Sequence, residues 1–511
     1  MTQHKNVVIV GGGAAGWMAA LAMKQALPMG TKITVIESSK IGIVGVGEST
    51  NFSFTQMLHF CRVDMLDFIA KTEATIKLGC QFENFGGDGR AIFIPVSALP
   101  AIDGSNFLPP HLEHLREGDL MYVNKVANNE SLNDFGIAKF ALANKVPFTL
   151  RDGKPQAIGG IQLHINAGLA AKYLAKLALE RGVEHIDAIV QSIQSSDGGM
   201  ITGFGLDTGE SVKADFVFDC SGFHRLIIGK HYNTPWVDYR RYLPVDSAQP
   251  FLAQHNDGPV KPYSHFRAHK FGWLWSVPTH SRIGNGYVYD SSGISDEEVE
   301  RTLREVIDPN GVLPFKPLRF KAGRYEDVWV KNCMALGLSS GFLEPMDGTS
   351  LGIAMSQLDI LIKNPSLLFT LNEKEIAKVN ERIANLSEFS VANVYMHYAT
   401  GRNDTEFWTR FTVENGPPKF QEWVESWKEH TPKAFEANTG EAHTYAPLAM
   451  ICNYAGTNLT KAAFVRENAV LNLDTELSYT KKVVEHNVGV ALKHCLTQRQ
   501  LIDLLRQSPV T

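Results

Sequence analysis

The chain has 511 residues, 44% of them hydrophobic and 20% charged, with a formal net charge of −5 at pH 7. This length suffices for a large core, and the composition is that of an ordinary globular protein. The acidic balance provides no basic surface for nucleic acid or an anionic membrane. The six cysteines form no Cys-x-x-Cys pair, which favours reduced thiols over a disulfide framework or a zinc site. We therefore expect a cytoplasmic protein with no metal site, no membrane span and no nucleic-acid partner.

The first forty residues predict one half of a Rossmann fold. Asn6–Val10 is a short β-branched run typical of a buried parallel strand, and Gly11-Gly-Gly-Ala-Ala-Gly16 follows it directly. A helix is predicted from Trp17 to Leu27, and a second strand from Lys32 to Ile36 that ends in Glu37. A strand, helix and strand within about 30 residues is the spacing of a dinucleotide-binding β-α-β unit.

The glycine spacing in this turn has a specific physical purpose. Gly11 permits the tight turn, Gly13 lets the backbone approach a pyrophosphate, and Gly16 lets the helix pack on the strand. The helix N-terminus directs N–H donors at the anion. Glu37, 21 residues after Gly16, is placed to accept hydrogen bonds from the adenosine ribose hydroxyls. The motif predicts a dinucleotide site, but by itself it does not decide between FAD and NAD.

Later segments predict alternating strands and helices without repeats or an obvious linker, so we expect two intertwined lobes rather than separate domains. An Ala-, Leu- and Lys-rich helix, a pair of strands, an aromatic-rich strand region and a further helix follow one another. Helices separated by polar, Trp-rich connections are expected beyond about residue 370. The predicted elements are Leu169–Glu180, Ile201–Leu206, Ala214–Asp219, residues 260–290, Ile353–Lys363 and Thr497–Arg506.

Three further segments carry chemical character. Lys77 lies in Thr-Ile-Lys-Leu-Gly-Cys-Gln-Phe-Glu-Asn-Phe, Trp273 and Trp275 lie in Gly-Trp-Leu-Trp-Ser-Val-Pro, and residues 343–352 read Leu-Glu-Pro-Met-Asp-Gly-Thr-Ser-Leu-Gly. With the glycine-rich opening, these segments in this order resemble the flavin-dependent tryptophan halogenase family. The resemblance spans roughly residues 5–410.

The resemblance implies an α/β fold, with a Rossmann-type FAD-binding lobe of the aromatic-hydroxylase-like kind, a mixed β-sheet, and a mostly helical substrate-binding lobe. Residues 1–370 are expected to form the FAD-binding and halogenase core, with inserted substrate-side segments around 80–160 and 235–330. Residues 371–511 are expected to form a mostly helical region that closes the substrate site, with Tyr445 and Tyr454 helping to line it.

The resemblance also implies cofactors and partners. FADH2 from a separate NAD(P)H-dependent flavin reductase, O2 and a halide ion would produce hypohalous acid, which halogenates an electron-rich indole, tryptophan-like or phenolic substrate. The resemblance does not decide whether the protein forms a homodimer.

A second glycine-rich run, Ile41–Thr50, matches the strap that holds the flavin in the family. The cofactor-binding residues that we expect are Gly11, Gly13, Ala14, Ala15, Gly16, Glu37, Lys40, Val46, Gly47, Glu48, Val190, Leu338 and Leu351.

Lys77 and Asp347 are the expected catalytic residues. Lys has a compact charged head on a flexible stem, so Lys77 could hold hypohalous acid beside the substrate carbon. The family generally has Glu where Asp347 stands, followed by a small hydroxyl residue where Gly348 stands, and Glu344 could partly substitute. Backbone N–H groups of Thr349 and Ser350 match the family's halide-binding positions.

Plainer interpretations and two other functions stay open. Either acid could be only a helix N-terminal charge, and the Trp pair could be ordinary core rather than bulk that shields the flavin. An aromatic monooxygenase would oxygenate its substrate and consume NADPH. The Trp pair argues against it, and so does Ala335–Leu338, where the fold returns to the flavin, because this segment lacks the Gly-Asp pair that such hydroxylases usually carry there. A catalytically reduced FAD-binding protein is the other alternative. His164 and the segment from His397 to Trp408 also match the family, and we expect most of these residues to be structural.

Overall fold

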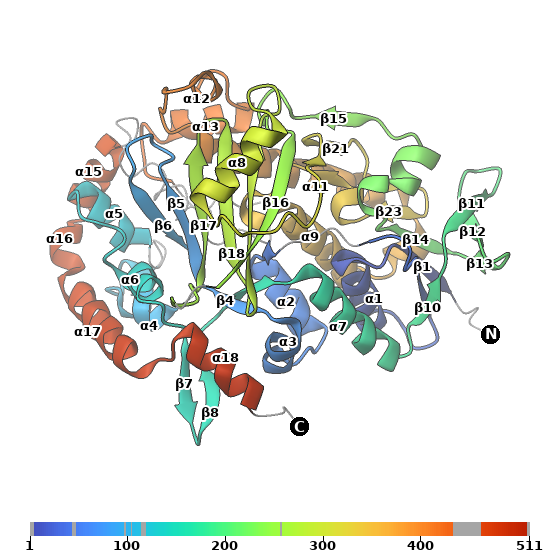
Figure 1. The fold of residues 1–511 in the computed structure, drawn as a ribbon, viewed down its shortest axis with the longest axis horizontal. Coiled ribbons are helices and arrows are strands. Elements are labelled where there is room, and N and C mark those ends of the chain that lie inside the picture. Colours follow the sequence, from blue (N-terminus) through green and yellow to red (C-terminus); the bar gives the residue numbers. More distant parts are fainter. Residues whose placement is uncertain are drawn as a thin grey trace. The chain divides into compact units, whose positions relative to one another are not determined.

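The computed structural model describes residues 5–42, 47–96, 99–103, 105–113, 119–255, 258–432 and 461–507. The chain forms two compact units, each assembled from three segments (Figure 1). The first unit contains Met1–Thr72, Ile165–Pro244 and Phe320–Glu388, and the second contains Glu73–His164, Val245–Arg319 and Phe389–Thr511. The segments of the two units therefore alternate along the chain, and the last boundary lies inside a long helix, α11 (Glu373–Tyr398).

A six-stranded sheet forms the centre of the first unit. Its order is β10-β2-β1-β14-β23-β22, and every pairing is parallel except that of β22 with β23. Val7 to Val10 and Phe216 to Asp219 are buried throughout, because a parallel sheet with helices on its faces leaves no strand face for water. The strands are β1 (Asn6–Val10), β2 (Lys32–Glu37), β10 (Glu184–Asp187), β14 (Phe216–Asp219), β22 (Trp329–Val330) and β23 (Cys333–Ala335).

Helices α7 (Ala167–Glu180) and α9 (Thr349–Lys363) pack against α1 (Ala14–Ala26) in this unit. Helix α1 begins three residues before the expected start at Trp17, because Gly13 in an extended conformation serves as its N-cap. The predicted α/β class and the Rossmann half are confirmed. The unit also contains β3 (Glu48–Ser49), α2 (Phe52–Phe60), α3 (Met65–Thr72), β11 (Val190–Ser195), β12 (Ile201–Leu206), β13 (Ser211–Lys213), β15 (Trp236–Asp238), β21 (Gly323–Tyr325), β24 (Gly341–Phe342) and α10 (Leu367–Thr370).

Asp219 joins the end of β14 to the turn that follows it. The side chain is fully buried, and its Oδ1 accepts hydrogen bonds from the backbone N–H of Ser221 at 3.0 Å and the Ser221 hydroxyl at 2.6 Å. Its Oδ2 accepts from the backbone N–H groups of Ile227 at 2.8 Å and Ile228 at 2.9 Å. One carboxylate therefore satisfies the second and third backbone donors of the π-helical turn η4 (Leu226–His231), while the first, the Leu226 N–H, donates to the Ser221 hydroxyl.

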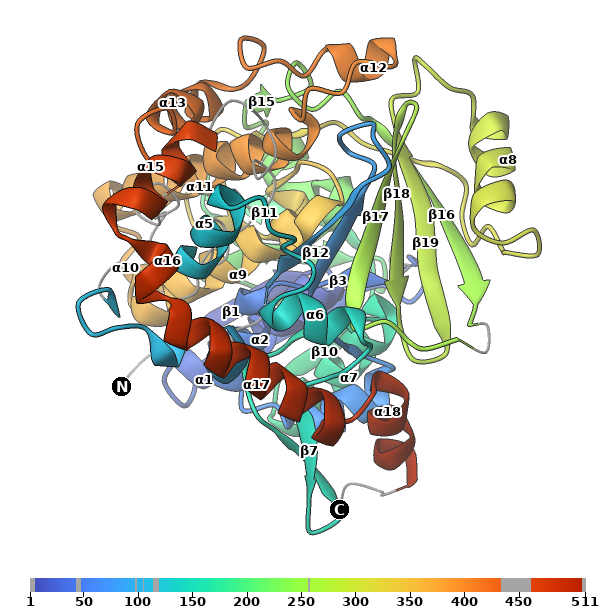
Figure 2. The ribbon, with the colours of Figure 1, turned by 90° about the vertical axis from the view of Figure 1, so that its left-hand side faces the viewer.

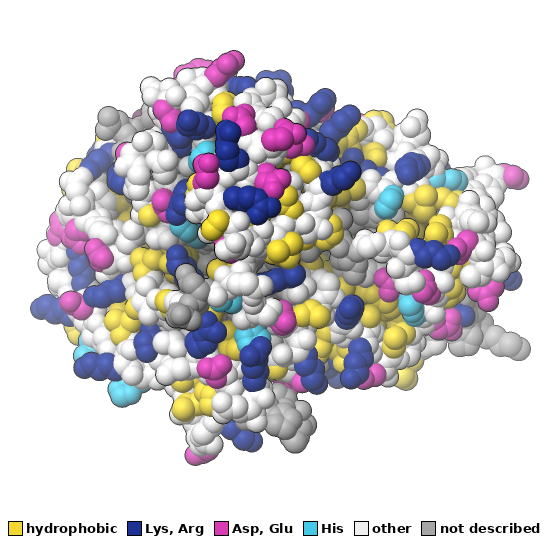
Figure 3. Space-filling model, in the orientation of Figure 1, with side chains coloured by type: hydrophobic (Ala, Val, Ile, Leu, Met, Phe, Trp, Pro, Cys, Tyr) yellow, Lys and Arg dark blue, Asp and Glu magenta, His cyan; other side chains and the backbone are white. Residues whose placement is uncertain are grey.

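A seven-stranded sheet dominates the second unit. Its order is β20-β16-β19-β18-β17-β5-β6, antiparallel except for the parallel pair β17 and β5. Helix α8 (Asp296–Val306) packs on β16 and β19 (Figure 2), with Val299 and Leu303 buried against Phe251 and Tyr287. The outer surface of α8 carries interspersed acidic and basic side chains (Figure 3), as expected for an amphipathic helix on a sheet.

The predicted strands at 260–290 and the helices beyond 370 are confirmed. None of the helices in the described ranges is both long and apolar enough to span a bilayer. The strands of this unit are β4 (Thr75–Lys77), β5 (Gly79–Glu83), β6 (Ala91–Pro95), β7 (Phe148–Arg151), β8 (Lys154–Ala157), β9 (Gln162–Ile165), β16 (Ser247–Gln254), β17 (Tyr263–His269), β18 (Gly272–Pro278), β19 (Arg282–Tyr289) and β20 (Leu318–Arg319). Its other helices are α4 (Pro100–Asp103), α5 (Asp119–Ala127), α6 (Gly136–Leu142), α12 (Glu406–Thr409), α13 (Pro418–Ser426), α15 (Lys461–Val470), α16 (Leu473–Glu476), α17 (Ser478–His494) and α18 (Gln498–Gln507).

We predict that Asp219→Asn destabilises the protein by about 2–3 kcal/mol, because the amide nitrogen would face backbone donors that then lack an acceptor. Thermal denaturation of the apoprotein should show a clear fall in melting temperature. Glu184→Gln is the control, since it removes only an exposed pair with Lys32 that is worth less than about 1 kcal/mol. Equal melting temperatures for the two variants would show that Asp219 does not hold the turn.

Candidate active site

The turn between β1 and α1 is tightly packed at two glycines and open at a third. Gly11 has a φ of +116°, and a Cβ there would collide with the carbonyl oxygen of Cys220. A Cβ on Gly16 would collide with the carbonyl oxygen of Gly11. A Cβ on Gly13, in contrast, would meet no atom within 4 Å. The turn is therefore shaped by contacts on its protein side and leaves space beside Gly13.

The start of α1 has the donors that an anion needs. No side chain caps the helix at Gly13, so the first-turn N–H groups at Ala14 and Ala15 lie where a helix leaves donors without intrahelical partners. The helix dipole adds positive potential at the same end. Together with the open space at Gly13, these features fit the pyrophosphate of a dinucleotide.

Glu37 lies directly beside this turn. A Cβ on Gly12 would collide with its carboxylate, so the carboxylate and the turn are in close contact. Its Oε1 lies 3.3 Å from His185 Nε2. Burial raises the pKa of Glu37, while His185 and a hydrogen bond with Trp17 oppose the rise. The carboxylate is thus held in place by protein contacts, and its side chain keeps 27% exposure for a ribose hydroxyl.

The other cofactor candidates occupy several elements of the first unit. Leu338 lies in the short helix η5 (Gly337–Ser339), where the Cβ position of Gly337 is 3.2 Å from Ala15 Cβ, so η5 adjoins the start of α1. Val190 begins β11 and packs on the core. Lys40 is exposed and its Nζ lies 3.3 Å from Asp207. Val46, Tyr445 and Tyr454 fall outside the described residues.

The end of the second glycine-rich run meets the start of α9. Gly348 has a φ of +62° and is the N-cap of α9, and a Cβ there would collide with the carbonyl oxygen of Ser49. Further along the helix, Gly352 lies against the side chain of Asn51, which caps α2 by accepting a hydrogen bond from Phe54. Gly47 and Glu48, two of the expected cofactor-binding residues, directly precede Ser49 in the sequence, and Ser49 contacts the start of α9.

Helix α9 starts four residues before the expected Ile353, so Thr349 and Ser350 belong to its first turn rather than preceding the helix. The left-handed conformation of Gly348 allows this earlier start. The Thr349 N–H donates to the carbonyl oxygen of Met346, while Thr349 Oγ1 and Ser350 Oγ are buried without a hydrogen-bond partner among the described residues. Leu351 follows them in the same turn. An anion at this end would find the N–H of Ser350 and these two hydroxyls.

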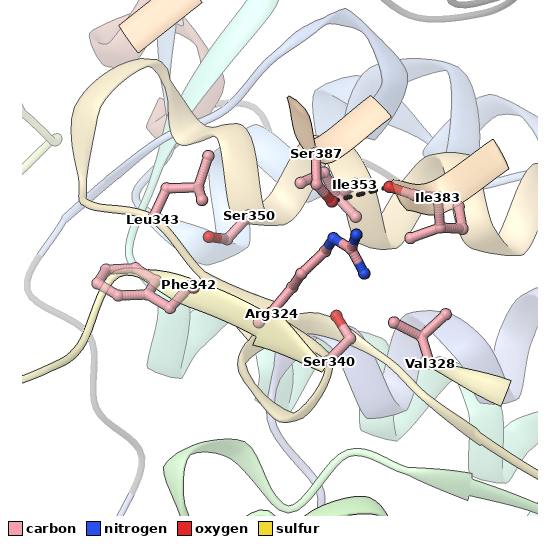
Figure 4. Close-up of a pocket in the computed structure, with 11 residues that line it drawn as sticks. Arg324, Val328, Ser340, Phe342, Leu343, Ser350, Ile353, Ile383 and Ser387 are labelled. Carbon is pink, nitrogen blue, oxygen red and sulfur yellow. Dashed lines mark hydrogen bonds between the residues drawn. The ribbon is translucent and has the colours of Figure 1, made fainter. Parts of the chain in front are cut away.

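A narrow pocket adjoins Ser350 in the first unit (Figure 4). Its empty volume, mouth included, is about 310 Å³, and Leu343, Phe342 and Ile353 give it apolar walls. The guanidinium of Arg324 enters it from β21 (Figure 4), with Nε 3.0 Å from the Tyr239 hydroxyl and Nη1 bonded to backbone carbonyl oxygens. Most Arg324 donors are therefore used within the protein, which makes the residue structural.

The expected carboxylates belong to the segment before α9. Asp347 lies in the short helix η6 (Met346–Gly348), and Glu344 is 1% exposed. Both are in the first unit, whereas Lys77 is in the second.

Lys77 is buried, with 1% exposure, at the end of the short strand β4. In the antiparallel pair of β4 and β9, Thr75 is opposite His164 and Lys77 is opposite Gln162. Residues two apart in a strand, and residues directly opposite across a pair, project from the same face. Four polar side chains thus share one face inside the second unit, and the burial of Lys77 shows that it is not an ordinary solvated surface lysine.

His164 anchors this polar face. The ring is fully buried, with Nδ1 3.0 Å from Thr75 Oγ1 and Nε2 3.0 Å from Ser264 Oγ. Burial, and secondly the positive charge of Lys77, hold the pKa of His164 well below its ordinary value. The family match pointed to His164, but the sequence carried no signal for Gln162 or Ser264.

Trp273 and Trp275 occupy alternate positions of β18 and are both buried. Trp273 Nε1 donates to the Tyr398 hydroxyl at 2.8 Å, and its ring packs edge-on against Phe266. The ring of Trp275 fills the space that a side chain at Gly286 would take. Within the second unit the pair is part of the packed core of the sheet.

In the described ranges, no group of three or more His, Cys, Asp or Glu side chains is arranged to hold a metal.

Comparison with known proteins identifies the family of the chain. The family model for tryptophan halogenase matches residues 6–466. The 7-chloro-L-tryptophan 6-halogenase KtzR of Kutzneria sp. (strain 744) is 30% identical over 474 residues, which cover 88% of this chain and 90% of that protein. The tryptophan 7-halogenase RebH of Lentzea aerocolonigenes is 31% identical over 422 residues, which cover 79% of this chain and 78% of that protein.

A solved structure gives the same result at the level of the fold. A tryptophan C-6 flavin-dependent halogenase (chlorinase) from taromycin biosynthesis has a TM-score of 0.86 to this chain at 27% identity. The similarity covers 98% of this chain and 100% of that chain. The chain therefore belongs to the tryptophan halogenase family and is, as the sequence predicts, an enzyme of the flavin-dependent halogenase kind.

Proposed function

We propose that the protein is an FADH2-dependent halogenase that converts halide to hypohalous acid and uses Lys77 to direct this acid to an electron-rich aromatic substrate. The observation that carries the proposal is the burial of Lys77 at 1% exposure in a chain that also has an open dinucleotide turn at Gly13. Burying a charge costs free energy, so a lysine without a role would keep its ammonium group in water.

The first unit supplies the residues that would hold FAD. The N–H groups at Ala14 and Ala15 would bind the pyrophosphate, and Glu37 would accept hydrogen bonds from the ribose. Reduced FAD, when bound, supplies two electrons, so that FADH2, O2, halide and one proton yield FAD, water and hypohalous acid. A separate NAD(P)H-dependent flavin reductase would regenerate FADH2.

The start of α9 would hold the halide. The N–H of Ser350 and the buried hydroxyls of Thr349 and Ser350 are donors at the positive end of a fifteen-residue helix. Apolar residues such as Leu343, buried at 2% exposure, would limit hydration of the ion. A weakly hydrated anion is a better nucleophile than a fully hydrated one.

Lys77 would act on the hypohalous acid rather than on the substrate. Its ammonium can donate a hydrogen bond to the oxygen, which makes the halogen atom more electrophilic as the aryl carbon attacks. The carbon–halogen bond forms, the halogen–oxygen bond breaks, and hydroxide leaves as water after taking a proton. The arene loses its proton to a carboxylate, and Asp347 is the proposed acceptor.

The proposed substrate class is an indole, tryptophan-like or phenolic compound. The relatives named above act on tryptophan or chlorotryptophan according to their names, which favours an indole ring. The proposal also includes assembly of the protein into a homodimer.

We predict that Gly13→Ala lowers FAD affinity at least tenfold while leaving the melting temperature of the apoprotein unchanged. Gly13 has an extended conformation that Ala adopts readily, and its Cβ would meet no protein atom, so only a ligand would be displaced. Flavin fluorescence titration measures the affinity. Gly198→Ala, in an exposed turn with space for a methyl group, is the control. Unchanged FAD affinity in Gly13→Ala would place the dinucleotide elsewhere.

We predict that Lys77→Met lowers halogenated product by about 100-fold or more, while FAD affinity and FADH2 oxidation stay at wild-type values. Methionine keeps most of the buried volume but removes the ammonium. The assay supplies FADH2, bromide and an indole panel, with a hypohalite scavenger present, and mass spectrometry quantifies product. Substantial scavenger-resistant product from Lys77→Met would reject the relay through this residue.

We predict that Asp347→Asn lowers the turnover number more than tenfold with little change in KM, because a proton acceptor acts after the substrate binds. Glu344→Gln is the matched variant three residues earlier. If Glu344→Gln impairs turnover and Asp347→Asn does not, the acceptor of the arene proton is Glu344 and not Asp347.

A further inference from the structure

His164 is a buried titratable side chain that the proposed reaction does not use. It lies in β9, and its ring makes hydrogen-bond contacts through both nitrogens to residues of two other strands, Thr75 in β4 and Ser264 in β17. These residues are 89 and 100 positions away in sequence. A ring used in this way fixes strands relative to one another.

The hydrogen-bond pattern determines which nitrogen carries the proton. Thr75 has one hydroxyl proton, and it donates that proton to the carbonyl oxygen of Pro278 at 2.6 Å. Thr75 Oγ1 must therefore accept from His164, so Nδ1 is protonated. In a neutral ring Nε2 is then an acceptor, and Ser264 donates to it. The chain of bonds runs from Ser264 through His164 and Thr75 to Pro278 in one direction.

The same bonds control the position of Lys77. Strand β4 has only three residues, so its backbone ladder alone holds it weakly. Lys77 lies two residues after Thr75, on the same face as His164. The backbone next to Lys77 makes two further hydrogen bonds. Gln498 Nε2 donates to the Ile76 carbonyl oxygen at 3.0 Å, and the Leu78 N–H donates to the Pro262 carbonyl oxygen at 2.8 Å. The residues on either side of Lys77 are thus bonded to other elements, and His164 adds a side-chain hydrogen bond to Thr75 in the same strand.

We propose that His164 is a positioning residue for Lys77, and that it fixes β4 against β17 and β18 as a neutral imidazole protonated at Nδ1. This inference rests on the proposed role of Lys77 and adds the device that keeps the ammonium in register. A protonated ring would lose the acceptor for Ser264 and would place a second positive charge near Lys77. Burial and the charge of Lys77 both favour the neutral ring.

Three variants at one position test the proposal. His164→Asn keeps a donor where Nδ1 lies, His164→Gln keeps a polar group where Nε2 lies, and His164→Ala removes both. The measured quantity is the coupling ratio, the halogenated product formed per O2 consumed. We expect His164→Ala to lower this ratio about tenfold with unchanged FAD affinity and unchanged FADH2 oxidation. His164→Asn should recover more of the ratio than His164→Gln, because the bond to Thr75 is the one made to β4, the strand that carries Lys77.

Several outcomes separate positioning from general stabilisation. A coupling ratio for His164→Ala within twofold of the wild type would overturn the proposal, and so would a loss of FAD binding equal to the loss of product. If His164→Ala does not fold, Ser264→Ala replaces it and should lower the ratio about threefold, whereas an unchanged ratio would overturn the proposal.

A double variant separates this inference from the proposed function. In a Lys77→Met background, His164→Ala should cause no further loss of product, and a further loss would show that His164 acts independently of Lys77. Wild-type product from Lys77→Met itself would instead reject the proposed function.

Discussion

The close approach of three backbone segments at the end of β1 is the constraint on which the first unit depends. Gly11, Gly16 and Cys220 are so near one another that neither glycine can carry a side chain. This contact seats α1 on the sheet and directs its uncapped N-terminus to one side. Asp219, one residue before Cys220, fixes the adjoining turn with four hydrogen bonds. The proposed dinucleotide site is therefore shaped by backbone packing, with few side chains needed to form it.

A different principle operates around Lys77 in the second unit. There, side-chain hydrogen bonds rather than glycines define the geometry, because β4 is too short for its ladder to hold it. Buried polar networks specify one arrangement strongly when every member has a partner. Such rigidity suits the role proposed for Lys77, which is to hold a small, reactive carrier beside one carbon atom of the substrate. If the ammonium group of Lys77 could move, we would expect hypohalous acid to be lost to water, while the rate of the flavin reaction would stay the same.

Local patterns in the sequence were sufficient for the Rossmann half and for the family, but not for the network around Lys77. The strand at Asn6–Val10 and the glycines after it obey short-range rules that any reader of the sequence can apply. The bonds between Thr75, His164 and Ser264 join segments about a hundred residues apart, and no local periodicity encodes them. The start of α9 was placed too late, because the left-handed conformation of Gly348 is set by contact with a distant segment.

That contact also explains one departure of this chain from its family. The family generally has a small hydroxyl residue where Gly348 stands, and Glu rather than Asp before it. Here Gly348 adopts a φ of +62° with the Ser49 carbonyl oxygen in the place of a Cβ, so only glycine fits this turn. Asp347 directly precedes this glycine in η6, so the two departures that the sequence shows are adjacent in the chain. The catalytic role proposed above for Asp347 would thus be exercised from a residue whose immediate neighbour has to be glycine.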